Sequence, residues 1–285
     1  MKEATAEIGA AETISQVAQP RAGRRFAIAL RQSGPPAALI ALFIVLWQVA
    51  VVVGRVPEWL LPAPARILQT MWEVSPALVP HVGQTLLETF WGLLLSLATG
   101  AVLAFAIDLS PLLRRALYPL LVASQTIPII ALAPLLVVWF GFSIVSKVVV
   151  VALVCFFPIA INLADGLRAT DPEHVALLRA MGAGRGQIFR TVRLPSALPS
   201  FFSGFKIAVT YSVIGAVIAE WIGASQGLGL YMIRSANAFR TAQLFAAIIV
   251  TSLLSIALFL LTSGVERMLL PWYYTAKREE QWESL

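Results

Sequence analysis

The side chains of this sequence that could do chemistry lie in two settings. One is a charged stretch, DPEHVALLRAMGAGRGQIFRTVRLP, which runs from Asp171 to Pro195 and together with Arg168 just before it holds five arginines. The other is a set of isolated polar residues inside long apolar runs. Neither contains paired carboxylates, a metal-ligand cluster, a nucleophile with its base or a G-x-x-x-x-G-K-[ST] phosphate loop. The sequence therefore predicts no catalytic and no metal-binding residue, and it leaves noncovalent contacts and hydrogen bonds as the available chemistry.

The charged stretch predicts two short helices joined by a tight turn. Asp171 is suited to cap the first helix, and Pro172 to its first position. Gly182 can adopt the left-handed conformation that stops a helix, and Pro195 is expected to end the second. The first helix has one apolar face, formed by Val175, Leu177, Leu178, Ala180 and Met181. An ordinary amphipathic loop between membrane spans is the alternative interpretation of the same pattern.

The composition places this chain in a membrane. Hydrophobic residues make up 59% and charged residues 13%, with a mean hydropathy of +0.82, against about 45–50% and 25% in soluble proteins. The lone Cys155 is expected to be a small buried hydrophobe. His81 and His174 are too isolated to predict a metal site. The net charge of +6 is assigned to membrane orientation and to lipid headgroups of the bilayer, and no nucleic-acid partner is expected.

Apolar runs long enough to cross a bilayer predict an all-α integral membrane protein with six transmembrane helices, since each crossing needs about 20 helical residues. Residues 1–34 are expected to be a cytoplasmic N-terminal tail, 35–275 a transmembrane domain with its core at 85–268 and a cytoplasmic loop at 168–195, and 276–285 a C-terminal tail. The expected spans are Pro36–Gly54, Thr85–Leu109, Leu117–Phe140, Ile144–Asp165, Leu198–Ile222 and Ala242–Val265. A separate interfacial helix is expected from about Pro64, ahead of the second span.

Basic residues predict the orientation. With both termini cytoplasmic, most of the 21 lysines and arginines fall in the tail, in the charged stretch and in the other cytoplasmic segments, as the positive-inside rule requires. Lys206 is expected to extend to the cytoplasmic surface. Glu88 and Glu220 lie near the outer ends of their spans, where each could simply reach the membrane interface.

The third span is interrupted by Gln125-Thr126-Ile127-Pro128 and again by Pro134. Each proline removes a backbone donor, so the freed carbonyls need other partners or a water-lined cavity. This break indicates a substrate path, with a packing kink as the alternative. The residues expected to line that path are Gln125, Thr126, Pro128, Asn162, Tyr211, Ser212, Glu220 and Trp221.

The charged stretch resembles the EAA loop of ABC-importer permeases, in which Gly182 and the ending Val192-Arg193-Leu194-Pro195 fall in register. The motif's acidic residue is replaced here by Ala176, and Leu177 and Leu178 stand in place of its two alanines. The resemblance implies that the loop forms a coupling helix that fits a cleft on a separate ATPase. The residues to which it assigns this contact are Glu173, Ala176, Leu177, Leu178, Arg179, Ala180, Met181, Gly182, Ala183, Phe189, Leu194 and Pro195.

Further segments, QTIPIIALAPLLVVWFGF and TYSVIGAVIAEWIGASQGLGL, resemble the permeases for taurine, alkanesulfonates, nitrate, riboflavin and thiamine-precursor pyrimidines. The resemblance implies a type I importer fold in the inner membrane, two permease copies around one pore, two cytoplasmic ATPases that bind ATP and Mg, and an external substrate-binding protein. The chain itself is expected to hold no cofactor and to be no enzyme. The lack of basic residues in the expected path favours a neutral heterocycle over an anion, which stays the alternative.

Two other classes of protein compete with this interpretation. A secondary transporter or channel would work without ATP and would show paired broken helices, of which one is visible around Pro128. A membrane enzyme would need convergent catalytic groups, which the sequence does not display.

Overall fold

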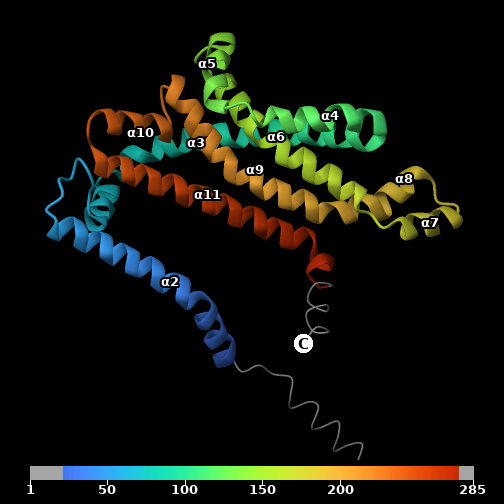
Figure 1. The fold of residues 1–285 in the computed structure, drawn as a ribbon, viewed down its shortest axis with the longest axis horizontal. Helices are drawn as coiled ribbons and strands as arrows, with labels where there is room; N and C mark the ends of the chain where they lie inside the picture. The colour runs from blue at the N-terminus through green and yellow to red at the C-terminus, as the bar shows by residue number, and fades with distance from the viewer. Residues whose placement is uncertain (1–21, 276–285) are drawn as a thin grey trace, which may run out of the picture. The chain divides into compact units, whose positions relative to one another are not determined.

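The computed structural model describes residues 22–275, and these contain helices and no strand. The chain divides into two compact units, Met1–Ala65 and Arg66–Leu285. The first 21 residues of the predicted N-terminal tail and the C-terminal tail at 276–285 lie outside the described residues. Figure 1 shows the helices coloured along the chain.

The helix α2 (Ala22–Val53) carries the first span. Its apolar part, Gly34–Val53, is long enough to cross a bilayer. The sequence interpretation started this helix at Pro36, whereas the structure has Pro35 and Pro36 inside it and begins it 14 residues earlier, at Ala22. Proline has a fixed φ close to the helical value, so two prolines interrupt the hydrogen bonds of α2 without ending it.

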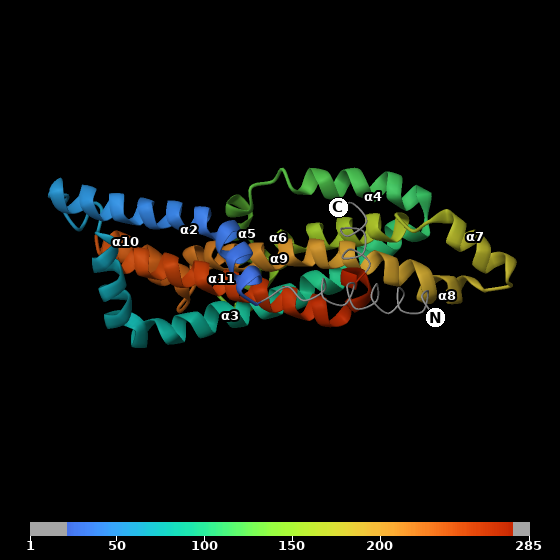
Figure 2. The ribbon, with the colours of Figure 1, turned by 90° about the horizontal axis from the view of Figure 1, so that it is seen from below.

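The helix α3 (Pro64–Leu109) joins two elements that the sequence interpretation kept apart. It begins at Pro64, as predicted, but the expected interfacial helix and second span form one assigned helix of 46 residues. Figure 2 shows that α3 changes direction along its length. Pro76 and Pro80 lie inside it, and the donors that they remove from the helix account for this bend.

The predicted third span is broken into α4 (Pro111–Ser124) and α5 (Ile129–Phe140), which meet at 97°. Pro128 is the N-cap of α5 in an extended conformation, with φ −64° and ψ 116°. A proline also biases the residue before it away from the α conformation, so the chain leaves the helix at the predicted position. The break at 125–128 is confirmed, while the single kinked span is replaced by a sharp bend.

Two long helices form the centre of the second unit, α6 (Ile144–Arg168) and α9 (Leu194–Gly223). They lie side by side over most of their length (Figure 1). Gly204 of α9 faces the Pro158 carbonyl and Asn162 of α6 so closely that a Cβ at this position would overlap them. Small residues let membrane helices approach in this way, which increases van der Waals contact.

The remaining elements complete this unit: α7 (Pro172–Ala180), α8 (Arg185–Ile188), η1 (Phe189–Arg193), α10 (Leu228–Asn237) and α11 (Thr241–Leu269). Both views place α7 and α8 at one end of the central pair and α10 at the other (Figures 1 and 2). In the described part of the chain, five helices are long and apolar enough to span a membrane, or six if α4 and α5 count as one bent span.

One boundary of the charged stretch is corrected by the structure. Pro195 does not end the second helix; it occupies the first turn of α9, and a continuous helical run extends from Arg185 to Gly223. The π-helical turn η1 lies just before it, and the Leu194 N–H donates to the carbonyl of Phe189, five residues back. A π turn inserts one residue into a helix, and this extra residue lets the chain pass a proline that would otherwise clash with the preceding turn.

Candidate functional site

The helix α7 is built as its sequence predicts. The Asp171 carboxylate accepts a hydrogen bond from the Glu173 N–H at 2.8 Å, and Pro172 takes the first helical position. Gly182 has a φ of +85°, which a residue with a Cβ adopts at a cost of about 1–2 kcal/mol. The Ala183 N–H then donates to the Leu178 carbonyl at 2.9 Å and closes the helix end.

The apolar face of α7 divides into an outer and an inner part. Leu177 and Met181 are 60% and 74% exposed. Val175 instead lines a pocket beneath the helix, and Leu178 is half-buried. Together Leu177 and Met181 form an exposed apolar knob at the end of the central helix pair. Ala176, where the resemblance would place a carboxylate, is exposed beside it.

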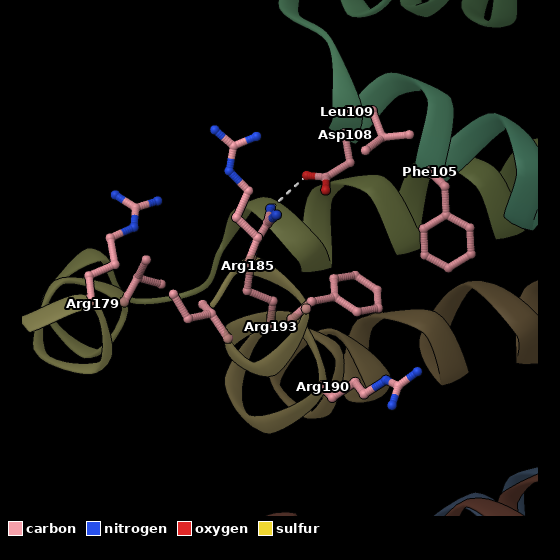
Figure 3. Close-up of a pocket in the computed structure, with 11 residues that line it drawn as sticks. Phe105, Asp108, Leu109, Arg179, Arg185, Arg190 and Arg193 are labelled. Carbon is pink, nitrogen blue, oxygen red and sulfur yellow. Dashed lines mark hydrogen bonds and ion pairs between the residues drawn. The ribbon is translucent and has the colours of Figure 1, made fainter. Parts of the chain in front are cut away.

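The pocket beneath α7 has a volume of about 790 Å³ and opens to the surface. Apolar side chains from the end of α3 and from η1 form its floor, including Phe105 and Phe189, whose rings meet edge to face at 6.0 Å. Figure 3 shows four arginines around it. They are Arg179, Arg185, Arg190 and Arg193.

Arg193 differs from the other three because it is paired. Its guanidinium donates to Asp108 Oδ1 at 2.7 Å and to the Leu167 carbonyl at 3.1 Å (Figure 3 draws the contact with Asp108). Asp108 is the next-to-last residue of α3 and Leu167 the next-to-last residue of α6, so this one side chain joins the start of α9 to the ends of two other spans. The sequence interpretation did not assign Arg193 this role.

A second pocket, of about 380 Å³, lies at the bend between α4 and α5. Gln125 and Pro128, two of the residues predicted to line a substrate path, line this pocket together with Phe156 of α6. None of its lining residues is charged. The Thr126 hydroxyl donates to the Ala123 carbonyl at 2.8 Å and so is used within the turn.

The other residues predicted to line the path do not gather at this pocket. The Asn162 amide donates to the Pro158 carbonyl, and the buried Ser212 hydroxyl donates to the Val209 carbonyl, so both serve their own helices. Tyr211 and Trp221 are 48% and 42% exposed on α9. Their place in a transport path stays a prediction.

The Glu220 side chain is buried in the protein interior. It is 0% exposed, its Oε1 accepts a hydrogen bond from the Thr85 hydroxyl at 2.6 Å, and its Oε2 accepts one from the Gly229 N–H. Thr85 in turn accepts from the Leu228 N–H at 3.0 Å, and His81 Nδ1 accepts from the Gly227 N–H at 3.0 Å. Side chains of α3 and α9 therefore hold three successive backbone donors at the start of α10.

Glu88 is also 0% exposed, so neither acidic residue reaches an interface as the alternative interpretation allowed. Its Oε1 accepts a hydrogen bond from the Gln84 amide at 2.8 Å. Lys206, which was expected to extend to the cytoplasmic surface, is half-buried. Its ammonium lies 2.7 Å from Glu266 Oε2, and this partly buried ion pair joins α9 to α11. A charge in a span needs such a partner, and Glu266, 60 positions away, gave no sign of the pairing in the sequence.

Comparison with known proteins agrees with this architecture. Residues 92–273 match the family model described as "Binding-protein-dependent transport system inner membrane component". The chain is 42% identical over 243 residues to the "Formylaminopyrimidine transport permease protein ThiX" of Halalkalibacterium halodurans, covering 85% of this chain and 96% of that protein. It is 34% identical over 241 residues to the "Riboflavin transport system permease protein RibX" of Chloroflexus aurantiacus, covering 84% and 90%.

Other relatives, at 33% identity and below, are named as permeases for aliphatic sulfonates, taurine and nitrate. Among solved structures, the "MetNI methionine ABC transporter" contains a chain of similar fold, with a TM-score of 0.57 at 21% identity, covering 70% of this chain and 97% of that one. The family match extends over most of the membrane helices and the whole charged loop. This chain is therefore a multi-pass inner-membrane protein that belongs to the binding-protein-dependent transport permeases, the membrane subunits of ABC importers.

Proposed function

We propose that this permease forms a translocation path for a small neutral heterocycle and is driven by a separate ATPase that docks on α7. The observation that carries this proposal is the exposed knob of Leu177 and Met181 at the end of the central helix pair. Apolar side chains exposed together at the tip of a helical loop are typical of a protein contact. The orientation that fits is the predicted one, with the loop and both termini cytoplasmic.

Movement follows from the way in which α7 is attached. The preceding helix α6 ends at Arg168 and the run leading into α9 begins at Arg185, so a force on α7 reaches both central helices. We infer alternating access, in which closure of the ATPase pair shifts α6 and α9 and opens the path outward. ATP and Mg belong to the ATPase in this scheme, a second permease copy completes the pore, and an external binding protein delivers the solute.

The substrate class rests on the pocket at the bend between α4 and α5. Its polar groups come from Gln125 and Ser124, its lining includes the Phe156 ring, and no charged side chain faces it. An amide can hydrogen-bond a ring nitrogen or carbonyl, and an aromatic ring can stack on a planar solute. An anion would be met by arginine or lysine, which this lining lacks, or by the N-terminus of α5, which does line the pocket at Pro128 and Ile129. The names of the pyrimidine and riboflavin relatives agree with this choice, and a sulfonate, taurine or nitrate substrate is the alternative.

The docking role is tested by replacing Leu177 with Asp. A charge in the knob is expected to abolish co-purification of the cognate ATPase and ATP-dependent uptake in proteoliposomes, while membrane insertion stays normal. Gln187→Asp places the same charge at an exposed position of the same loop, outside the knob, and is the matched control when both variants are compared at high salt, where exposed charges are screened. ATPase binding by Leu177→Asp at the wild-type level would refute the docking role.

A secondary transporter is the competing function, and the same proteoliposomes test it. Uptake by the permease alone, driven by an ion gradient without ATP or the ATPase, would favour it. The single sharply bent helix pair in the described residues is less than the paired broken helices expected of that class.

A further inference from the structure

The charges around the pocket beneath α7 do not balance. Arg179, Arg185 and Arg190 are exposed at its rim, and none of them forms an ion pair within residues 22–275. Nearby acidic groups are already engaged, because Asp108 pairs with Arg193 and Asp165 pairs with Arg114. The rim therefore presents three guanidinium groups with no internal counter-charge.

The acidic residues of the loop do not compensate for these arginines. Asp171 caps α7 and lies 3.3 Å from His174 Nδ1, so its carboxylate is engaged at the start of the helix. Glu173 is the remaining carboxylate of α7, against three free arginines. Ala176 supplies no charge. The loop surface is thus basic, with an apolar knob beside its charges.

The free arginines are placed to meet an incoming surface. Figure 3 shows the guanidinium groups of Arg179 and Arg185 extending away from the phenyl ring of Phe105 in the pocket floor. Arg179 lies two residues after Leu177 and two residues before Met181 in the sequence. Leu177 and Met181 form the knob that we propose enters the ATPase. Residues two apart face different sides of a helix, so Arg179 lies on the pocket side with Val175, and a cleft that encloses α7 on both sides would cover this charge together with the knob. Desolvating a guanidinium without a counter-charge is unfavourable.

Resting on the docking role proposed above, we infer that the ATPase cleft that receives α7 carries carboxylates at its rim, opposite Arg179, Arg185 and Arg190. Arginine suits this task because its planar guanidinium can bind a carboxylate through two parallel hydrogen bonds. Such contacts speed association and select the correct ATPase among related ones, while the apolar knob supplies most of the affinity. An anionic lipid headgroup is the other acidic ligand available at a membrane surface, and the experiment distinguishes it.

The first measurement is the association rate of the purified cognate ATPase with full-length permease in nanodiscs of phosphatidylcholine alone, from 50 to 500 mM NaCl. Salt is expected to slow association because it screens exposed charges. Arg179→Glu, Arg185→Glu and Arg190→Glu are each expected to slow it by roughly two- to fivefold at low salt and less at high salt. Arg115→Glu makes the same change at an exposed position of α4, outside the pocket, and should have no effect.

The second measurement identifies the partner group. Arg185→Lys keeps the charge and adds a primary amine, and a carbodiimide joins an amine to a carboxylate in direct contact without a spacer. A cross-link that maps Lys at position 185 to an Asp or Glu of the ATPase is expected. Arg115→Lys should form none, and the wild-type permease provides the background from other amines.

Each result decides between the possibilities. ATPase binding that is independent of salt and unchanged by the three reversals would overturn this inference, while sensitivity to Leu177→Asp would still support the docking role. Loss of the reversal effect in phosphatidylcholine, with its return when phosphatidylglycerol is added, would assign the arginines to lipid and also overturn the inference. No binding by the wild-type permease in any condition would refute the proposed function itself.

Discussion

The Thr85 hydroxyl of α3 donates a hydrogen bond to Glu220 Oε1 of α9 at 2.6 Å and accepts one from the Leu228 N–H at 3.0 Å. The two side chains are 135 positions apart in sequence and both are 0% exposed. Their contact fixes the start of α10 against two spans. Glu220 is thus a positioning residue for α10 in this structure, and a direct role toward a solute is not needed to explain its place in the membrane.

Thr85→Val should therefore destabilise the permease. It leaves the Leu228 N–H without an acceptor in a buried site and removes a donor from Glu220, a loss of about 1–3 kcal/mol. Thermal unfolding in detergent would show a lower midpoint. Thr99→Val on the same helix is the control, because the Thr99 hydroxyl is bonded within α3 alone and that residue is exposed. Equal midpoints for the two variants would contradict the positioning role.

Gly204→Ala tests the close approach of α6 and α9. The added methyl group would overlap the Pro158 carbonyl, which is backbone and cannot turn away. Overpacking of this kind costs about 1–3 kcal/mol. The matched change is Gly264→Ala in α11, where no atom lies within 4 Å of the new Cβ and the gain in helix propensity is about 0.5–1 kcal/mol. Unfolding midpoints should fall in the first variant and not in the second.

The ion pair of Lys206 and Glu266 predicts a non-additive result. Either single change, Lys206→Met or Glu266→Leu, leaves one charge without its partner between α9 and α11, at a cost of about 1.5–3 kcal/mol. The double variant should recover much of that loss, because both charges are then gone. A double-mutant cycle on thermal stability measures the coupling. Additive single and double effects would show that the pair contributes nothing.

The pocket that we propose for the substrate predicts an effect on uptake that spares assembly. Gln125→Leu removes the amide from the bend between α4 and α5, and one lost hydrogen bond to a neutral solute should raise the KM for uptake by about two- to tenfold. Thr126→Val is the control, because its hydroxyl is used within the turn. Uptake of the solute found by thermal-shift screening of the cognate binding protein would be measured. An unchanged KM would remove Gln125 from the path.

The parts of this structure that follow from local chemistry were predictable from the sequence. Asp171, Pro172 and Gly182 define α7 through short-range hydrogen bonds and backbone preferences, and the structure confirms each of them. Pro128 breaks the third span at the predicted position. Apolar runs of sufficient length gave the spans, because the bilayer thickness sets the helix length.

Long-range contacts were not predictable from one sequence. The partners of Glu220 and Lys206 come from other helices and lie 135 and 60 positions away, so nothing local indicates them. The prediction that a helix ends near these prolines was also wrong. The helix α3 continues through Pro76 and Pro80, and the helical run that leads into α9 continues through Pro195. Proline marks a missing donor, but whether the helix bends, inserts a π turn or stops depends on neighbours that can compensate.

The π turn at Phe189–Arg193 has a consequence for transport. Because it lets the helix pass Pro195, the 39 residues from Arg185 to Gly223 form one continuous helical run about 58 Å long, at a rise of 1.5 Å per residue. A tilt imposed on its loop end swings the opposite end the other way, next to the bonds that hold α10. In the proposed orientation the two faces of the membrane are thereby linked by one continuous helical run, and no relay of side chains is required between them.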